Sequence, residues 1–364
     1  MVHAKRSQIG FSLVELMIAM AIGLLVVSIA GTAIHGQVKT SSFGHAVSRA
    51  QTNGLFALES IADAVRTAGY TGCATVNRSV PRLPEGFTSA AVARASYSPI
   101  EGFVVKASAW EPAMPDGYGS YTPPTTGFAT PIPGSHALLL EGGYTEGAAL
   151  AISTSTSNQV DLVSRPFGLE KGDLALISDC NNAEAFYIQG TSEPGSGIWR
   201  LNTHNPFSNL YSLQSSYPEA ARVIPYRRTL YFVGDSGRST ANGDPIRSLF
   251  EHAHPFGSQS PEEIAEGVES MVVQFRQKLS DGTIQELVAG HADIDPEQTI
   301  SVRISLLVSV PSYKESNEQT QKHVLSGIEL GTNTSSGPTY VNDQRVRKVF
   351  EQTVNVKNAI GALL

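Results

Sequence analysis

The feature that most constrains this sequence is an apolar segment close to the N-terminus. From Phe11 to Ile34 there are 24 residues and one ionisable side chain, Glu15. A helix rises about 1.5 Å per residue, so this segment would be roughly 36 Å long and would cross a hydrocarbon core of about 30 Å. No small-residue cleavage site ends the run, as it would in an ordinary secretory signal. We therefore expect a leader over residues 1–10 and a membrane-spanning helix over residues 11–34.

Glu15 is the anomaly within this segment. A carboxylate in the middle of a bilayer costs about 2.5–3.5 kcal/mol, and ionisable residues at such depth usually have a function. Two interpretations stay open: Glu15 reaches the headgroup water from near the helix end, or a cation from a partner neutralises it. Cleavage after Gly10 would create an ammonium group on Phe11, one helical turn from Glu15. In a parallel array of helices, the Glu15 carboxylate would then meet the Phe11 ammonium of a neighbouring subunit and fix the axial stagger.

The sequence from Gly10 to Glu15, Gly-Phe-Ser-Leu-Val-Glu, resembles the prepilin motif of type IV pilins and type II secretion pseudopilins. The resemblance implies cleavage after Gly10 by a prepilin peptidase and N-methylation of Phe11 by the same enzyme. It also implies that Glu15 makes an assembly contact within the filament.

Charge and cysteine usage indicate where the rest of the chain resides. Lys5 and Arg6 precede the apolar segment, so the positive-inside rule leaves the N-terminus in the cytoplasm and sends the head to the periplasm. The formal charge of −7 becomes −9 when the leader is removed, because 24 basic residues then remain against 33 acidic ones. Since this negative charge would repel a nucleic acid, no nucleic-acid partner is expected. Outside the cytosol, Cys73 and Cys180 are more typical of a disulfide than of a metal or redox site, with two buried thiols as the alternative.

Beyond the membrane the helix is expected to continue over residues 35–68 and to stop at Gly69. Its apolar residues recur every three or four positions and predict a one-sided stripe: Val47, Leu55, Leu58, Ile61, Ala62 and Val65. Residues 69–364 are expected to form a β-rich head. Between Ser96 and Gly134 seven prolines predict a long ordered loop or insertion, whose Trp110, Tyr118 and Tyr121 either pin it to the head or contact a partner.

Short apolar runs bounded by Gly, Ser or Asn predict strands at 137–140, 159–163, 173–177, 185–188 and 228–233. The last third alternates most clearly, with Met271, Val273, Phe275 and Leu279 predicting one strand. In the next, the even-numbered positions from Ile300 to Val310 are apolar, and Leu307 is the one exception among the polar odd positions. The last strand places Val346, Phe350, Val354 and Val356 opposite Arg345, Arg347, Glu351, Thr353 and Asn355. This period of two predicts an antiparallel sheet with one buried face, covered by the helix stripe.

The resemblance extends along the chain. Ser178-Asp179-Cys180, the strand 304–308 and the terminal segments 345–350 and 353–358 resemble, in this order, PilW-type minor pilins. The resemblance implies an α+β, type IV pilin-like fold: a long N-terminal helix, its first half membrane-spanning, packed on an antiparallel β-sheet head with large loop insertions. A minor pilin of type IV pili that primes assembly, at the tip, is the function it implies.

The same resemblance implies the chain's surroundings. The partners would be other minor pilins and the major pilin, the prepilin peptidase, the inner-membrane assembly machinery and a large tip adhesin. The chain would reside in the inner membrane as a single-pass protein and then in the pilus fibre. A J-like minor pseudopilin of type II secretion is the alternative within the same class.

Three motifs suggest chemistry, but none is specific. Gly234-Asp235-Ser236-Gly237 matches a fragment found around the nucleophile of serine proteases, yet Arg238 departs from the usual continuation and no suitable His-then-Asp context precedes it. His252 with His254 lacks a third metal ligand, and Asp235, Asn242 and Asp244 miss the EF-hand spacing for calcium. We therefore expect no catalytic residue, metal or cofactor. A membrane-tethered periplasmic hydrolase using Ser236 is the alternative of another class.

Overall fold

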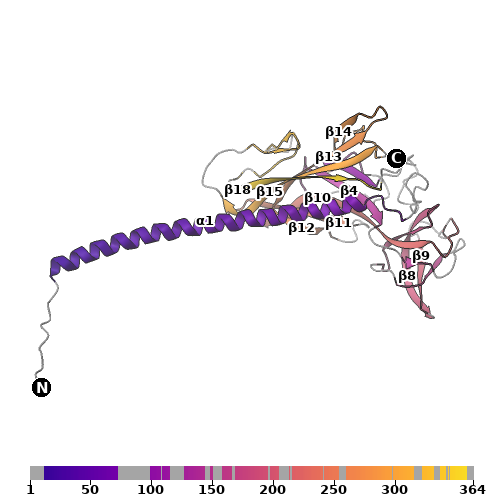
Figure 1. Ribbon diagram of the computed structural model, residues 1–364, viewed down its shortest axis with the longest axis horizontal. Coiled ribbons are helices and arrows are strands. Elements are labelled where there is room, and N and C mark those ends of the chain that lie inside the picture. The colour runs from indigo at the N-terminus through magenta and orange to yellow at the C-terminus, as the bar shows by residue number, and fades with distance from the viewer. Residues whose placement is uncertain are drawn as a thin grey trace, which may run out of the picture. The chain divides into compact units, whose positions relative to one another are not determined.

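The computed structural model describes residues 12–358 apart from 73–98, 108, 115–126, 144–147, 151–157, 166–168, 196, 205–212, 214, 241, 254–259, 297, 315–321, 332–336, 342 and 344. One helix, α1 (Leu13–Thr67), runs unbroken for 55 residues (Figure 1). The predicted stop at Gly69 is confirmed, since this residue has the left-handed backbone (φ 77°) typical of a helix C-cap. The chain divides into two compact units, Met1–Arg49 and Ala50–Leu364, which are described separately below.

Within the second unit, the last turns of α1 bury the predicted stripe. Leu58, Ile61, Ala62 and Val65 are all at most 4% exposed. The prediction for Leu55 is wrong, because that side chain is 61% exposed. Its neighbour Gly54 faces the sheet instead, and successive helical positions lie about 100° apart. A Cβ on Gly54 would come within 2.6 Å of the Phe350 ring, so the absence of a side chain permits this close approach.

A large antiparallel sheet of twelve strands makes up much of the head. Its strands follow the path β2-β1-β4-β10-β7-β8-β9-β6, while β3, β5 and β11 also pair with β10, and β12 pairs with β11. Their bounds are β1 Ile100–Val105, β2 Trp110–Glu111, β3 Thr130–Pro131, β4 His136–Gly143, β5 Ala148–Ala149, β6 Gln159–Leu162, β7 Leu174–Ser178, β8 Ala183–Gly195, β9 Ile198–His204, β10 Arg222–Ser239, β11 Pro245–Ala253 and β12 Glu262–Glu266.

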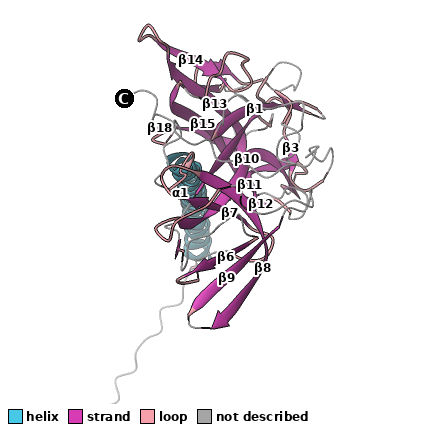
Figure 2. Ribbon diagram, turned by 90° about the vertical axis from the view of Figure 1, so that its right-hand side faces the viewer, coloured by secondary structure: helices cyan, strands magenta, loops and turns pink. Residues whose placement is uncertain are grey.

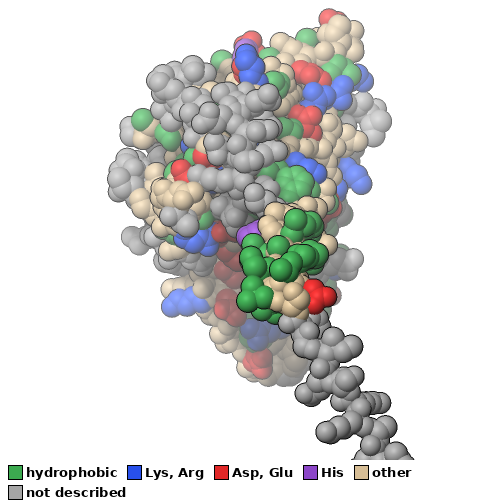
Figure 3. Space-filling model, turned by 90° about the vertical axis from the view of Figure 1, so that its left-hand side faces the viewer, with side chains coloured by type: hydrophobic (Ala, Val, Ile, Leu, Met, Phe, Trp, Pro, Cys, Tyr) green, Lys and Arg blue, Asp and Glu red, His purple; other side chains and the backbone are tan. Residues whose placement is uncertain are grey.

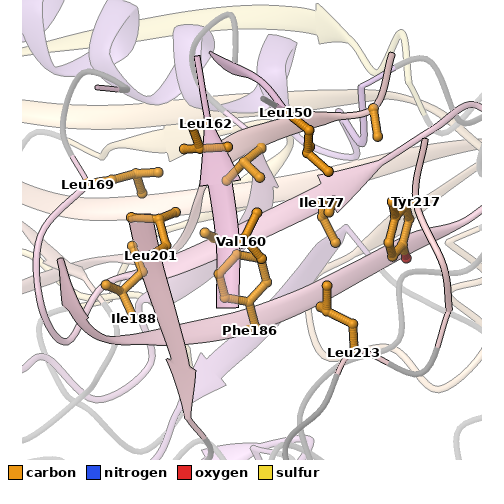
Figure 4. Packing of buried hydrophobic residues seen from close by; sticks show 13 residues of the cluster. Leu150, Val160, Leu162, Leu169, Ile177, Phe186, Ile188, Leu201, Leu213 and Tyr217 are labelled. Atoms are coloured by element: carbon orange, nitrogen blue, oxygen red, sulfur yellow. The ribbon is translucent and has the colours of Figure 1, made fainter. Parts of the chain in front are cut away.

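Strand β10 belongs to two parts of this sheet. Residues 222–225 pair with β7, whereas residues 226–232 pair with β4 and residues 229–239 with β11. The β6–β9 part therefore forms a lobe, which Figure 2 shows on the far side of the head from β13, β15 and β18. Its core gathers thirteen buried residues, including Val160, Ile177, Phe186 and Leu201 (Figure 4). All five short runs predicted as strands are confirmed, and three of them, in β4, β8 and β10, are longer than predicted.

The predicted loop between Ser96 and Gly134 is wrong in part. Its described residues include β1, which pairs along five residues of β4, and the short β2 and β3. Trp110 is 6% exposed and makes edge contacts with Phe103 and Phe232. The aromatic side chain therefore pins this segment to its own head, because the apolar positions 100, 103 and 105 supply a strand pattern that the prolines obscured. Tyr118 and Tyr121 lie outside the described residues.

A second antiparallel sheet contains the C-terminal strands in the order β14-β13-β15-β18. Their bounds are β13 Val268–Lys278, β14 Ile284–Val288, β15 Thr299–Lys314 and β18 Arg345–Asn355. The alternation predicted for β13, β15 and β18 is confirmed on the face that carries Val273, Ile304 and Val354, which are all buried. Leu279 is an exception, since it lies in the turn after β13, where its N–H bonds to the Thr283 carbonyl (2.9 Å).

The prediction of one buried face is wrong, because both faces of β15 are covered. Ser301, Ser305 and Ser309, expected on the solvated face, are at most 2% exposed. A small hairpin, β16 (Val324–Leu325) and β17 (Ile328–Glu329), packs over this side. There Leu307 joins a second apolar cluster with Val272, Leu325, Leu330 and Tyr340. The single apolar exception in the alternation was therefore the sign that this face is also covered.

Candidate functional site on the N-terminal helix

The first turn of α1 is closed by a capping box. The Ser12 hydroxyl accepts a hydrogen bond from Val14 N–H (3.3 Å), and Glu15 Oε2 accepts one from Ser12 N–H (3.1 Å). The Ser-x-x-Glu spacing permits this reciprocal arrangement, which satisfies main-chain donors that have no partner within the helix. A carboxylate here also interacts favourably with the positive end of the helix dipole. Glu15 therefore has a partner in its own chain, in addition to any it gains from a neighbour.

Behind the cap, the helix presents apolar side chains on all sides. The residues from 12 to 38 are exposed apart from the half-buried Gly31. The exposed fraction is 75% for Leu13, 77% for Leu24 and 71% for Val27. In Figure 3 these side chains form a green surface over the near end of the helix. This stretch is long and apolar enough to cross a membrane.

Two threonine side chains in this part of α1 form hydrogen bonds to the helix's own main chain. The Thr32 hydroxyl donates to the Ile29 carbonyl (2.8 Å), and the Thr40 hydroxyl donates to the Gly36 carbonyl (3.0 Å). In lipid an unpaired donor costs several kcal/mol, so threonines bonded within the helix are compatible with burial there. Glu15 is the one ionisable side chain between Ser12 and Ile34.

Of the residues predicted to act in processing and cross-linking, the structure describes only Cys180. Gly10, Phe11 and Cys73 lie outside the described residues, so the cleavage, the methylation and the Cys73–Cys180 disulfide stay predictions. Cys180 lies in the turn between β7 and β8 with a left-handed backbone (φ 71°). The turn is held by Asp179, whose Oδ1 accepts the N–H groups of Asn181 (3.0 Å) and Asn182 (2.7 Å).

Ser236 occupies a structural position in the β10–β11 hairpin. Its side chain is 4% exposed, and its hydroxyl donates to the Ile246 carbonyl at 2.7 Å. Asp235 Oδ1 accepts the Gly237 N–H (2.8 Å), and the hydroxyl of Thr240 bonds to Asp244 Oδ2 (3.2 Å). These groups hold a turn, and the hydroxyl is not presented to a substrate.

No group of three or more His, Cys, Asp or Glu side chains able to hold a metal occurs among the residues that the structure describes. His252 is buried at 1% exposed, while His254 lies outside that part of the chain.

A buried ionic cluster is the largest feature that sequence reasoning missed. Arg345 and Arg347 were expected on the polar face of β18, but their side chains are at most 2% exposed. The side chains of Glu269 and Asp343, which lie beside them, are 0% and 3% exposed. Arg347 binds Glu269 through Nε (3.0 Å) and Nη2 (3.1 Å) and Asp343 through Nη2 (2.6 Å). Burial lowers the pKa of Arg347, but the two carboxylates outweigh it and raise that pKa overall. An alternating strand pattern cannot show such pairing, because the partners come from distant segments.

Two other features were missed, and only the first of them has a signal in the sequence. The capping box is written in Ser12-Leu13-Val14-Glu15 as the Ser-x-x-Glu signature before an apolar run. Asn358, next to the predicted last strand, donates from Nδ2 to the carbonyls of Ala68 (3.1 Å) and Arg66 (3.3 Å), so it caps the C-terminal end of the helix. These two contacts join residues 290 and 292 positions apart, and no local signal predicts them.

Comparison with known proteins agrees with the resemblance noted in the sequence. Residues 230–358 match the family described as Type IV Pilus-assembly protein W, and residues 5–31 match the prokaryotic N-terminal methylation motif. Among solved structures, a type IV-like pilin from Thermus thermophilus is similar at 16% identity, over 52% of this chain and 86% of that one, with a TM-score of 0.21. The search of curated proteins finds no match.

The two family matches cover different functional parts. The first contains β11 to β18 and the buried ionic cluster, and the second contains the prepilin motif and most of the apolar stretch. Such a family suggests a structural, membrane-anchored protein that interacts with other components of a pilus. The resemblance drawn from the sequence is therefore confirmed: residues 5–31 match the N-terminal methylation motif and residues 230–358 match the type IV pilus-assembly protein W family, in a chain that folds as one long apolar helix followed by antiparallel sheets.

Proposed function

We propose that the chain is a minor pilin, made as a precursor in the inner membrane and incorporated through α1 into a type IV pilus. There it helps to prime assembly with other minor pilins at the tip of the fibre. The observation that carries the proposal is the capped and exposed apolar helix with a single carboxylate in its first turn. A surface of this kind needs lipid or other apolar helices around it. When the chain leaves the membrane, the helices of neighbouring subunits in a filament replace the lipid.

The chemistry of the chain in this proposal is that of a substrate. Hydrolysis of the Gly10–Phe11 amide adds water, leaves a carboxylate on Gly10 and frees an amine on Phe11 that is protonated at neutral pH. Methylation of that amine keeps its positive charge and leaves two N–H donors. The Glu15 carboxylate lies one helical turn after Phe11, and one of its oxygens accepts a hydrogen bond from Ser12 N–H. The Phe11 ammonium of an adjacent subunit supplies the positive charge that offsets the burial of this carboxylate in lipid.

The first test is the mass of the mature N-terminus in membrane and sheared-pilus fractions. We expect the wild-type chain to begin at Phe11 and to carry one methyl group in both fractions. Gly10→Leu should leave a longer form in the inner membrane, because the added side chain blocks the peptidase. A wild-type protein that begins at Met1 in every fraction would contradict the proposal.

The second test separates the charge of Glu15 from its role in the cap. Glu15→Ala removes both, while Glu15→Gln keeps an oxygen that can accept from Ser12 N–H and removes the charge. Both variants should be processed normally and both should be depleted from sheared pili, whereas Ser12→Ala, which weakens the cap alone, should be incorporated. Normal incorporation of Glu15→Gln would contradict the proposed role of the ion pair.

The match to the pilus-assembly family supports a pilus over a secretion pseudopilus. The genes that neighbour this one provide a direct check: pilin genes and a large adhesin gene agree with the proposal, and secretion-system genes favour the pseudopilin. The hydrolase alternative gains no support from Ser236, whose hydroxyl is buried and bonded to the main chain.

A further inference from the structure

One edge of the C-terminal sheet carries a row of main-chain groups that pair with no other strand among the residues that the structure describes. Strand β18 is the last strand of this sheet and pairs with β15 on one side. The Val356 N–H donates to the Ile300 carbonyl (3.1 Å), which fixes the register in which even-numbered residues of β18 bond to β15. The N–H and C=O groups of the odd-numbered residues therefore point away from the sheet. These residues are Val349, Glu351, Thr353 and Asn355, and all four are exposed.

This edge lacks the features that protect the other described edges. The outer strand β14 and the outer strand β12 each have five residues. Strand β12 carries the acidic side chains of Glu262, Glu263 and Glu266, and the Asn53 side chain donates to the carbonyl of Glu266 (2.9 Å). From residue 347 to 355, by contrast, β18 keeps one regular register with β15 and contains no proline. Short length, charge, proline and bulges are the usual protections of an edge strand.

The free edge also carries a single charged side chain, and its strand is held in place at both ends. Glu351, its one charged member, accepts from the Ser305 hydroxyl (2.8 Å) and Ser326 N–H (3.0 Å), so its charge is satisfied across the sheet. The strand is held at one end by the ionic cluster around Arg347 and at the other by the buried Val354 and Val356. An edge that is already ordered loses little entropy when a partner strand adds to it.

We propose that the 349–355 edge of β18 accepts an additional β-strand from a different pilus component, so that the sheet continues from one subunit into the next. This inference rests on the proposed function, because it takes the partner from the pilus. The chemistry of the edge specifies the partner: an extended segment with free main-chain groups and uncharged side chains opposite Val349 and Thr353. About 20 Å of strand is available, enough for roughly six residues of the partner.

The symmetry of a filament argues against the same edge of a second copy as the partner. Neighbouring copies in a helical filament are related head-to-tail, so a surface of one copy meets a different surface of the next. Two identical edges could pair only if they faced each other through a two-fold axis, which a head-to-tail arrangement does not contain. A strand from a different chain meets no such conflict.

Thr353→Pro tests the inference, with Thr353→Ala as the matched control. The N–H of Thr353 points outward, so proline removes no bond to β15 but places its ring where the added strand would lie. Loss of two or more hydrogen bonds of about 1 kcal/mol each should lower the amount in sheared pili about tenfold or more. Thr353→Ala should be incorporated like the wild type. Thermal unfolding of both full-length variants in detergent should match the wild type.

A photoreactive phenylalanine analogue at position 353 identifies the neighbour. We expect a cross-link in sheared pili to another pilin-type chain, and none from the same analogue at Ser192 in β8. Equal incorporation of Thr353→Pro and Thr353→Ala would overturn the inference, and so would a cross-link to a second copy of this chain. The wild type distinguishes the two proposals: its absence from sheared pili contradicts the proposed function, whereas its presence together with undiminished Thr353→Pro contradicts only the strand addition.

Discussion

His136 links the two sheets of the head through a hydrogen bond that needs a neutral imidazole. Its Nδ1 accepts from the Val273 N–H (3.0 Å), and the ring is 4% exposed. Val273 lies in β13 and His136 in β4, and the adjacent Ser135 hydroxyl similarly accepts from Met271 N–H (3.1 Å). These side chains thus connect β4 and β13, two strands of different sheets, which have no main-chain pairing with each other.

This histidine predicts a loss of stability in acid. Burial lowers the pKa of His136 to about 4, against an ordinary value near 6.5. As the pH falls from 6.5, the unfolded chain takes up this proton before the folded one, so the free energy of unfolding should decrease until about pH 4, by roughly 3 kcal/mol. Thermal unfolding of the full-length chain in detergent between pH 7.5 and 4.5 measures the effect.

His136→Asn is the control for this prediction. Its side-chain oxygen can accept from Val273 N–H but does not titrate, so other acid-sensitive groups act equally in both proteins. The stability of the variant should depend less steeply on pH than that of the wild type. Parallel curves would show that His136 does not titrate between these limits.

At the scale of elements, the contact of α1 with β18 depends on a residue without a side chain. Gly54→Ala would place a methyl group 2.6 Å from the Phe350 ring. Overpacking of this kind costs about 1–3 kcal/mol, while alanine gains up to about 1 kcal/mol in helix propensity, so we expect a net loss of about 1 kcal/mol in the free energy of unfolding. Denaturant unfolding of the full-length chain in detergent provides the measurement.

Gly44→Ala in the same helix is the matched control, since an added Cβ there meets no atom within 4 Å. It should leave the protein as stable as the wild type or make it slightly more stable. Gly54→Ala combined with Phe350→Leu should be less destabilised than the sum of the two single variants, because the smaller side chain makes room for the methyl group. A Gly54→Ala protein as stable as Gly44→Ala would refute the close contact.

The elements also show what the sequence can and cannot predict. The apolar helix, its end at Gly69 and the strands around Leu139, Phe186 and Ile304 follow from local period and punctuation, and all are confirmed. Leu55 was assigned wrongly, because an apolar stripe is about 100° wide and a glycine can occupy its centre. The strand β1 was missed because seven prolines in its neighbourhood outweighed a short apolar pattern.

On the scale of the whole molecule, the candidate site was predictable and the ties within the head were not. The prepilin motif is local, so Glu15 and its neighbours could be named from ten residues. The cluster around Glu269 gathers Arg247 from β11, Arg345 and Arg347 from β18 and the main chain of Val341, and only the folded chain brings these together. Arg345 also donates to the Pro245 carbonyl (2.8 Å), so the cluster joins the two sheets.

Removal of Glu269 should therefore weaken the whole head. Three arginines in this cluster face two carboxylates, and Glu269→Gln would leave them with Asp343 alone. Removing one partner of a buried ion pair costs about 3–5 kcal/mol, which corresponds to a fall in Tm of roughly 10 °C for a head of this size. Glu59→Gln, which removes an exposed partner of Arg66, should change Tm very little.

A double variant tests whether the buried charge is the cause. Glu269→Gln with Arg347→Gln restores the original balance of one excess positive charge, so it should be less destabilised than the sum of the two single variants. The same comparison by hydrogen exchange should show protection lost in β11 and β18 together, since both strands depend on this cluster. If Glu269→Gln unfolds within 2 °C or so of the wild type, the cluster does not hold the sheets together, and the hydrogen bonds of Ser135 and His136 to β13 carry that role instead.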